Sequence, residues 1–471
     1  MRGACDSSYA ISISLVSAPT VANQTTSCDP DDLCIRRPQP VHNVARFNGM
    51  DRHATLVGAQ LRAAREAAGV SLAAVAREIH YSKSALAYFE TGERTPPPDA
   101  IAWYEKRFGG LKDPVAALAD LGKADVERRT FLRAGYSTAL SASVLLPGWI
   151  DPSPRTAGGA VRSIGRADVS AVREVMSLFS RMDQRMGGGH GRTAVVQYLT
   201  TEVVGYLNGT YTDNTVRNDM FSAAAELSYL VGWMAFDNDE HHVAQRYFST
   251  ATKLAAEADD APLTGHVLRA MAHQAIDLGH PEEGLRLAEA SVTGARYRTA
   301  SPRERALLKV VHAKALSAAR RPADAARALL TAEQDLAAAS AQIPEPARVF
   351  FFSEASLAHE TACALRDAGD LSGAAAQFEL SVRKREATAF TRTHAVTLGY
   401  LGAVQADQGD LELACATWSS ALTAMQGVQS GRTRNVARDI RNATAPHSNS
   451  TTAAINQIGD QAAQYLAAHA I

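Results

Sequence analysis

Small residues recur at nearly regular intervals through the second half of this chain of 471 residues. Five of them, 40, 41, 49 and 40 residues apart, define anchor positions: Ala244, Gly284, Ala325, Ala374 and Ala414. A second small residue stands twelve residues before each anchor, and a third stands seven after it: Gly232, Ala272, Ala313, Ala362, Gly402, and Ala251, Ser291, Ala332, Ser381, Ala421. Small side chains let two helices approach closely where they cross. The spacing therefore predicts helix pairs stacked into an α-solenoid, a fold that presents a concave binding surface.

Aromatic residues and turn signals follow the same register. Phe248, Phe378 and Trp418 each stand four residues after an anchor. Three anchors are preceded at five residues by a Gly with a polar follower: Gly279-His280, Gly369-Asp370 and Gly409-Asp410. This pattern resembles the tetratricopeptide repeat (TPR) over about residues 225–425, with a period longer than the usual ~34 residues. We expect longer helices or loops to absorb the difference. The alternative is an Ala-rich helical bundle whose periodicity arises by chance.

Residues 56–108 carry a second pattern, that of several short helices. Gly69 is a stop signal for the first helix, and Ser71 is placed to cap the second. Ser82 caps a third helix, which ends at Gly92. Two short helices joined by a tight turn and flanked by core-forming helices are typical of a helix-turn-helix domain.

The residues of these helices resemble the Xre-type helix-turn-helix family, similar to phage repressors. The matching positions are Leu61-Arg62-x-x-Arg65-Glu66-x-x-Gly69-x-Ser71, Val75-Ala76 and Ser82-x-Ser84-x-Leu86-x-x-Phe89-Glu90-x-Gly92-x-Arg94-x-Pro96. In this family the second helix of the pair enters the major groove of DNA. The resemblance implies base contacts from Lys83, Ser84 and Tyr88. It also implies contacts to phosphate, which position the domain without reading sequence, from Arg62, Arg65, Arg77 and Arg94.

Three features of this region depart from the family pattern or weaken it. Leu72 stands where the family usually has a Gln that contacts the DNA backbone, and His80 replaces the usual Gly of the turn. We therefore expect His80 to adopt the backbone conformation that the turn requires. Residues 51–108 contain eight basic and seven acidic side chains, so their net charge is close to zero. Because affinity for DNA rests largely on neutralising phosphates, the alternative is a domain kept only for docking to proteins.

The segment between the two patterns contains a linker and a Gly-rich turn. Residues 151–165 are rich in Pro and Gly. A helix predicted from about Asp168 to Met186 is followed by glycines that suit a helix–helix turn better than a phosphate loop. From Asp183 onward the chain resembles actinobacterial regulators that join an Xre-type domain to TPR-like repeats. The resemblance rests on Asp183-x-x-x-Gly187-Gly188-Gly189-His190-x-Arg192, Tyr198-Leu199 and Gly232-Trp233-Met234-Ala235-x-Asp237.

The first helix of each predicted pair would line the concave groove of a TPR-like solenoid. Projection from the anchors places seven side chains there: Tyr229, Trp233, Arg269, His273, Lys314, His359 and Arg366. Aromatic residues beside cationic ones suit an extended peptide or an acidic ligand. The alternative is a solvated groove that binds nothing small.

Composition and motifs argue against several other functions. The net charge of −1 predicts no general attraction to polyanions. The five Cys residues show no metal-ligand spacing and no disulfide framework, so we expect no metal or other cofactor. No apolar stretch reaches the ~18–20 residues of a membrane span. Nucleophile elbows, metal-binding helix motifs and phosphate loops are missing from the sequence, so we expect no enzymatic activity and no catalytic residues.

The termini of the predicted segments follow from composition. We expect a disordered extension (1–49), a helix-turn-helix domain (50–110), a connector and linker (111–165), a helical cap (166–222), TPR-like repeats (223–430) and a C-terminal linker and helix (431–471). Met50 directly precedes the first predicted helix and is a second candidate for the start of translation. Arg128-Arg129 resembles an export signal but lies far inside the chain, so we expect a cytoplasmic protein.

These patterns together predict a transcriptional regulator that binds a DNA operator. The solenoid would form a homodimer or bind a peptide or protein ligand. The segment Glu127–Leu146 carries Phe131 and Leu132, and we expect it to couple the domains by docking on the solenoid or on a second subunit. The alternative function is a TPR interaction scaffold whose helix-turn-helix domain no longer binds DNA.

Overall fold

The computed structural model describes residues 58, 61–62, 64–66, 68–94, 96–108, 114–134, 162–447 and 453–469. These residues are almost entirely helical, and their one sheet is a parallel pair, β1 (Ser163–Ile164) with β2 (Thr210–Tyr211). The all-α fold class is therefore confirmed. The chain divides into two compact units, with the boundary between Ile101 and Ala102. That boundary lies within α4 (Pro98–Phe108), before the limit at residue 110 that the sequence predicted.

The first unit contains the predicted pair of short helices, α2 (Leu72–Glu78) and α3 (Lys83–Thr91). The Ser71 hydroxyl accepts a hydrogen bond from the Ala74 amide at 3.2 Å, and the Ser82 hydroxyl accepts one from the Ala85 amide at 3.1 Å. Each serine thus satisfies an amide that has no partner within its own helix. Gly92 ends α3 in the left-handed conformation, with φ of 75°.

Apolar side chains from each helix of the first unit meet in its core. Leu61, Val75, Leu86 and Phe89 are buried there. A Cβ atom at Gly58 would lie 2.1 Å from the carbonyl oxygen of Phe89, so only Gly allows the first helix to cross α3 this closely.

His80, in the turn between α2 and α3, does not have the left-handed backbone conformation. Among the described residues, the non-glycine positions with positive φ are Asp239, Asp259 and Arg320. His80 is not one of them, so the turn imposes no backbone strain on it. The substitution of His for the usual Gly is compatible with the turn for this reason.

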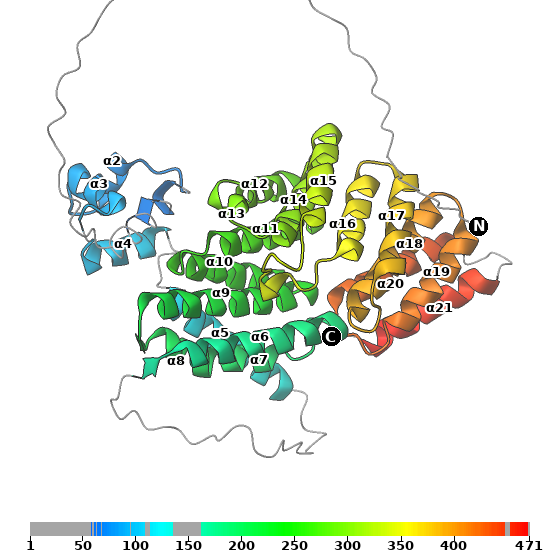
Figure 1. Cartoon of the computed structure of the whole chain (residues 1–471), viewed down its shortest axis with the longest axis horizontal. Helices are drawn as coiled ribbons and strands as arrows, with labels where there is room; N and C mark the ends of the chain where they lie inside the picture. The colour runs from blue at the N-terminus through cyan, green and yellow to red at the C-terminus, as the bar shows by residue number, and fades with distance from the viewer. Residues whose placement is uncertain are drawn as a thin grey trace, which may run out of the picture. The chain divides into compact units, whose positions relative to one another are not determined.

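The second unit is built on five successive helix pairs. They are α9 (Asn214–Asp237) with α10 (His241–Glu257), α11 (Ala261–Asp277) with α12 (Pro281–Ser291), α14 (Pro302–Ala318) with α15 (Pro322–Ala337), α16 (Glu354–Asp367) with α17 (Leu371–Lys384), and α18 (Thr391–Asp407) with α19 (Leu411–Ala424). Figure 1 shows these pairs following one another from green to orange. One short helix, α13 (Ala295–Arg298), lies between the second and third pairs.

The small residues of the sequence pattern lie where paired helices cross. A Cβ atom at Gly232 would lie 2.8 Å from the ring of Phe248, and one at Gly402 would lie 2.4 Å from Nε1 of Trp418. Gly284 is equally close to Ile276, at 2.6 Å. A large side chain of the partner helix, Phe248, Trp418 or Ile276, therefore fills the space that each of these small residues leaves. Helix pairs stacked in this register confirm the predicted solenoid.

The interval of 49 residues between the third and fourth anchors has a structural cause. Residues 338–353 join α15 to α16 and contain a single 3-10 turn, η2 (Ala347–Val349). This segment, which we call the strap, carries Val349 and Phe352 into a core cluster with the helices of the second and third pairs. The strap is the longer loop that the sequence pattern required.

A helical cap precedes the first pair. It comprises α6 (Arg166–Met186), α7 (Arg192–Tyr198), the π-turn η1 (Leu199–Val203) and α8 (Val204–Leu207). α6 runs alongside α9 (Figure 1). The glycines of 187–191 form the helix–helix turn that the sequence predicted between α6 and α7.

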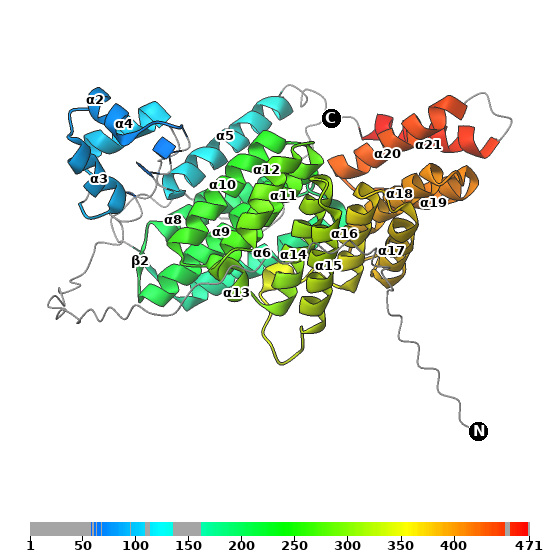
Figure 2. The same ribbon diagram turned by 90° about the horizontal axis from the view of Figure 1, so that it is seen from above.

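The C-terminal end of the chain is a helix pair and not a linker. α20 (Gly431–Thr444) contacts α18, and α21 (Ala453–Ala468) contacts both α19 and α20 (Figure 2). Val436, Ile440, Ile458 and Tyr465 are buried in the same cluster as Trp418. The predicted linker at residue 431 is wrong because these apolar side chains extend the solenoid core.

The connector predicted over 111–165 begins with a helix that belongs to the second unit. α5 (Pro114–Ala134) packs on α7, η1 and α10 through Val115, Leu118 and Leu121. A Cβ atom at Gly122 would lie 1.8 Å from the Thr200 side chain, which shows how closely α5 meets η1. The coupling residues that we predicted, Phe131 and Leu132, have side chains outside the described set, as does most of the segment Glu127–Leu146.

Candidate functional site

The N-terminal half of α3 presents the predicted base-reading side chains on one exposed face. Lys83, Ser84 and Tyr88 are all exposed, and Tyr88 retains 50% of its accessible surface. The opposite face of α3 buries Leu86 and Phe89. Because the i, i+1 and i+5 positions lie on one side of a short helix, the three polar side chains can reach one surface together.

Two of the predicted phosphate contacts, Arg77 on α2 and Arg94 after α3, are exposed. Arg62 is also exposed, and its Nε donates to Glu66 at 2.9 Å, a pair one helical turn apart. Such exposed pairs hold their partners weakly because water and salt screen them, so phosphate could displace the carboxylate.

Arg65 does not suit a phosphate contact, and we correct its assignment. Its Nε and Nη2 donate to the two carboxylate oxygens of Glu90 at 2.7 and 2.6 Å. Its Nη1 donates to the Val70 carbonyl oxygen at 3.0 Å. The side chains of Arg65 and Glu90 are only 11% and 4% exposed, so the pair joins the first helix to α3 inside the domain.

The cap at the start of the solenoid contacts the segment that follows α19 at its other end. The concave groove is therefore not open as expected. The Gly189 amide donates to the Gln429 carbonyl oxygen at 2.9 Å, and the Gln429 amide donates to the Met186 carbonyl oxygen at 2.8 Å. A Cβ atom at Gly187 would lie 2.4 Å from the same Gln429 oxygen. The Gly-rich turn is therefore the place where the cap receives the segment that follows α19.

A buried ion-pair network reinforces this closure. Arg392 of α18 lies 3.0 Å from the carboxylate of Asp183 on α6 and 3.3 Å from that of Asp237 at the end of α9. Asp237 also accepts a hydrogen bond from the Gly188 amide at 2.8 Å. The three charged side chains are at most 3% exposed. Burial and the neighbouring Asp237 raise the pKa of Asp183 to about 6, against the opposing charge of Arg392.

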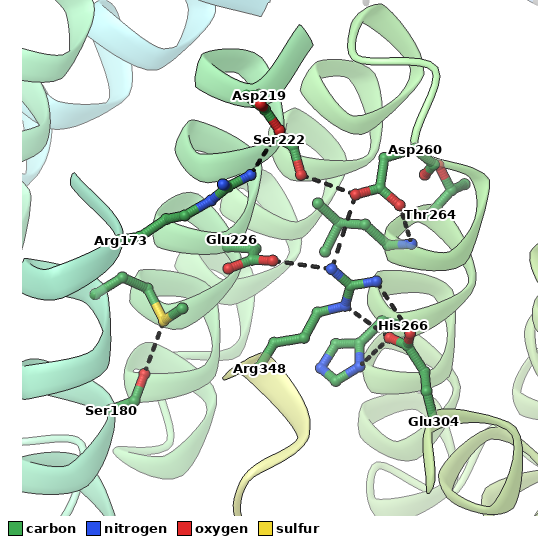
Figure 3. Close-up of polar contacts among 12 residues, drawn as sticks. Arg173, Ser180, Asp219, Ser222, Glu226, Asp260, Thr264, His266, Glu304 and Arg348 are labelled. Atoms are coloured by element: carbon green, nitrogen blue, oxygen red, sulfur yellow. Dashed lines mark hydrogen bonds and ion pairs between the residues drawn. The ribbon is translucent and has the colours of Figure 1, made fainter. Parts of the chain in front are cut away.

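The strap is held in the concave face by a second network. Arg348 donates to Glu226 of α9 at 2.9 Å and to both oxygens of Glu304 on α14 at 2.7 and 3.0 Å. Figure 3 shows Arg348 between these two carboxylates, with the His266 ring beside it and also facing Glu304. Burial raises the pKa of Glu304, but Arg348 and His266 outweigh burial and lower it to about 2. Glu304 is therefore ionised at neutral pH.

These contacts surround a cavity inside the helix pairs. Its volume is about 80 Å³. That is several times the roughly 10–15 Å³ that one water molecule needs. Four of the predicted groove residues line it: Tyr229, Trp233, Arg269 and His359. The charged lining that the sequence did not predict comprises Asp183, Glu226, Arg348, Glu360, Arg385, Arg392 and Arg432.

The other predicted groove residues gather around Arg432 of α20. Lys314 and Arg366 line a more open hollow that also contains Asp277 and Arg432. Arg432 donates to Nε2 of His273 at 2.8 Å and to Asp277 at 3.2 Å. Lys314 lies 3.0 Å from Asp277 and 3.4 Å from the same histidine nitrogen. His273 and Lys314 are thus committed to a structural network that includes Arg432 of α20, whereas Arg366 pairs with Asp367 at 3.0 Å.

The expected open groove is therefore wrong. Arg269, His273, Lys314 and His359 are between 1% and 5% exposed, because the strap, the cap and α20 cover the concave face. An extended peptide needs a continuous exposed surface. What the structure offers instead is a partly enclosed cavity lined by charged side chains.

Some of the site residues that the sequence did not predict belong to recognisable motifs, and others do not. Asp183, Gly188 and Asp237 belong to the motif that resembles the regulators, and they form the closure. Glu360 follows a predicted groove residue on the same helix. Arg348, Arg385 and Arg432 stand outside the repeat register, and no spacing in the sequence indicates them.

Acid should destabilise the second unit through His359. Its Nδ1 lies 2.9 Å from the Thr397 hydroxyl, which itself donates to the Thr393 carbonyl oxygen, so Nδ1 carries the proton of a neutral ring. Burial lowers the pKa of His359 to about 3. Since this folded value is below the unfolded ~6.5, stability is full above pH 6.5 and falls as the pH drops toward 3.

We expect the loss from His359 to reach about 2 kcal/mol by pH 5. His359→Gln should reduce the loss between pH 7 and pH 5 by that amount, measured by urea unfolding at both values. His280→Gln at an exposed position is the control. Equal pH dependence in the wild-type and His359→Gln chains would contradict the prediction.

Two further searches concern the described residues only. They contain no group of three or more His, Cys, Asp or Glu side chains placed to hold a metal ion. They also contain no helix long and apolar enough to cross a membrane.

Comparison with known proteins identifies the first unit. Residues 56–104 match a family of helix-turn-helix domains. The match covers the N-terminal domain and leaves the solenoid without an assigned family. No curated protein matches the chain.

Proposed function

We propose that this protein is a DNA-binding transcriptional regulator whose solenoid responds to a ligand. The exposed face of α3, with Lys83, Ser84 and Tyr88 side by side, is the observation that carries the proposal. It occurs in a domain that matches a helix-turn-helix family, where the second helix of the pair enters the major groove. Lys83 and Ser84 supply hydrogen-bonding groups suited to base edges, and Arg77 and Arg94 supply charge for phosphate.

The TPR-like solenoid has the regulatory and assembly role in this proposal. A homodimer with two-fold symmetry would bind an operator with two symmetric half-sites. Regulation then requires a ligand that binds the DNA-competent and incompetent states with different affinity. The proposed function is not catalytic and belongs in the cytoplasm, where an operator is available.

α5 is well placed to couple the units along the chain. It follows α4 and is fixed to the solenoid by a fully buried arginine, Arg192 of α7. Arg192 donates to Asp125 of α5 at 3.1 Å and to Glu240 before α10 at 2.8 Å. A change in the solenoid at this point would reach α5 directly.

Selection of random DNA duplexes with the full chain tests the proposal. We expect enrichment of one sequence with two inverted half-sites, since a symmetric dimer reads a palindrome. Recovery of duplexes no different from the starting pool would overturn it. Crosslinking of the chain to genomic DNA supplies an independent check of the same sequence.

Lys83→Ala should weaken operator binding selectively. Loss of one base contact should reduce the binding free energy by ~1–3 kcal/mol on the selected duplex and by little on a scrambled duplex of the same length. Arg77→Ala is the matched comparison, because loss of a phosphate contact weakens both duplexes alike. Titration of both variants on both duplexes at one salt concentration measures the difference. Equal loss on the two duplexes for Lys83→Ala would contradict its role as a base reader.

One observation favours the scaffold function instead. The near balance of charge over 51–108 is reinforced by Arg65, whose positive charge is turned inward to Glu90. A weakly basic surface gains little from counterion release. Under this second function the helix-turn-helix domain docks to a protein, and the duplex selection enriches nothing.

A further inference from the structure

The cavity of the second unit contains two arginines without a carboxylate partner. Arg348, Arg392 and Arg432 each contact at least one carboxylate. In the described part of the chain, Arg269 and Arg385 form no ion pair. Buried charges are normally paired, because removing an ion from water is costly. An unpaired buried arginine in a cavity wall is therefore a feature that needs an explanation.

Of these two arginines, Arg385 shows the lack of a carboxylate partner more clearly. It stands at the end of α17, is 8% exposed, and donates through Nη2 to the Ala355 carbonyl oxygen at 3.0 Å and to the Ser381 hydroxyl at 3.1 Å. Its Nε is buried and has no hydrogen-bond partner among the described residues. Burial lowers the pKa of Arg385 to about 10, although the negative charge of Glu360 acts in the opposite direction. Burial therefore disfavours the charged form of Arg385 in the folded chain.

Two more polar atoms of the cavity lining are buried without a partner. Nε1 of Trp233 can only donate, and Oε2 of Glu360 can only accept when the carboxylate is ionised. Arg269 lies 5.5 Å from the Trp233 ring and donates to the Tyr229 hydroxyl at 2.6 Å. The cavity thus offers donors on two sides and one acceptor, all in an environment that strengthens hydrogen bonds.

The remaining lining is largely aromatic. Tyr229 and Trp233 come from α9, and the strap supplies Phe350, Phe351 and Phe352. A cavity of about 80 Å³ suits a single small ring with one or two substituents, and it is too small for a folded peptide. Pockets of this composition bind the apolar body of a ligand and orient it with a few polar groups.

We propose that this cavity binds a small aromatic carboxylate, with Arg385 as the partner of its carboxylate group and Glu360 as the acceptor for a ligand hydroxyl. The inference rests on the proposed function, in which the solenoid responds to a ligand, and it assigns that ligand a chemical class. An anion at Arg385 supplies the missing counter-charge, and charge-assisted bonds of this kind are about twice as strong as neutral ones. The strap and the cap exclude water from the pair.

Calorimetric titration of the full chain without DNA tests the proposal. The probes are benzoate, 4-hydroxybenzoate and phenylacetate, each matched with its neutral amide, and inorganic phosphate as a second anion. We expect saturable binding of at least one carboxylate, at one molecule per chain. Its amide and phosphate should bind about tenfold more weakly or worse, because one lacks the charge and the other lacks the ring. No saturable carboxylate binding, or equal binding of the amide or phosphate, would overturn the proposal.

Arg385→Met separates a ligand-binding role from a structural one. An arginine kept for stability destabilises the chain when it is replaced, whereas one kept for a ligand does not, because the apolar variant removes an uncompensated buried charge. We expect the variant without ligand to melt at the same or a higher temperature and to bind the carboxylate at least about tenfold more weakly. Arg383→Met, on the same helix with an exposed side chain, should change neither property.

Arg385→Met with wild-type affinity for the carboxylate would refute the assignment. If the variant instead melts at a lower temperature, Trp233→Phe decides, since it removes the Nε1 donor, keeps an aromatic ring and leaves every charge of the cavity in place. Weaker carboxylate binding by Trp233→Phe then supports the site, and unchanged binding overturns it. All of these titrations omit DNA, so their failure leaves the operator selection intact. A failed operator selection likewise leaves carboxylate binding standing.

Discussion

Arg392→Met should lower the free energy of unfolding of the second unit by about 3–5 kcal/mol. The substitution leaves two buried carboxylates, Asp183 and Asp237, beside each other without their shared cation. Burial alone already disfavours ionised Asp183, and loss of Arg392 removes the charge that opposes this effect. The cap should then separate from α18. Urea unfolding of the full chain measures the stability, and hydrogen exchange over α6 locates the loss.

The control for this prediction is Arg383→Met. Arg383 forms an exposed pair with Glu379 one helical turn away, at 3.4 Å, so its replacement should cost less than about 0.5 kcal/mol. Adding Asp183→Asn to Arg392→Met should recover part of the stability, because it removes one of the two stranded charges. If the free energy of unfolding of the Arg392→Met chain stays within about 1 kcal/mol of wild type, the change is as small as that of an ordinary surface substitution. That result would contradict the structural role assigned to the closure.

Arg65→Met should unfold the helix-turn-helix domain rather than merely weaken its hold on DNA. It leaves the buried Glu90 carboxylate without the guanidinium that binds both of its oxygens, a loss of about 3–5 kcal/mol. Small domains have total stabilities of only ~5–15 kcal/mol, so this is a large fraction. Hydrogen exchange of α2 and α3 in the full chain should rise strongly. Operator binding should fall because the domain is no longer folded.

Arg62→Met provides the comparison on the same helix. Its side chain is 58% exposed and pairs only with exposed Glu66, so exchange in α2 and α3 should stay near that of wild type. A folded Arg65→Met domain that binds all duplexes more weakly would restore Arg65 as a phosphate contact. Exchange over the solenoid helices serves as an internal reference in both variants.

The helix pairs could be predicted because their cause is local. Gly232 accommodates Phe248 and Gly402 accommodates Trp418 across a single tight helix crossing, with both partners within twenty residues of each other. Such contacts repeat with the helix pair, so they leave a period in the sequence. The caps at Ser71 and Ser82 are local as well, because each bonds an amide three residues ahead.

The candidate sites were predictable to different degrees. Lys83, Ser84 and Tyr88 share an exposed helical face, which follows from helical spacing once the buried side of α3 is known. Arg65 was misassigned because charge and position on a helix do not reveal a partner twenty-five residues away in the chain. Four of the predicted groove residues line the cavity, and two others line the hollow beside Arg432. Their burial was missed because it depends on the strap and α20, which lie outside the register.

The sequence by itself determined the all-α class, the helix-turn-helix domain and the repeated helix pairs of this protein. Only the tertiary structure decided that the concave surface is a partly enclosed cavity. Two pairs in its wall, Arg392 with Asp183 and Arg348 with Glu226, are 209 and 122 residues apart. Contacts between such distant residues depend on the accumulated twist of all the intervening helix pairs, which no local spacing encodes. The unpaired charge of Arg385 acquires its meaning from the same closure, because only burial makes an unpaired cation costly.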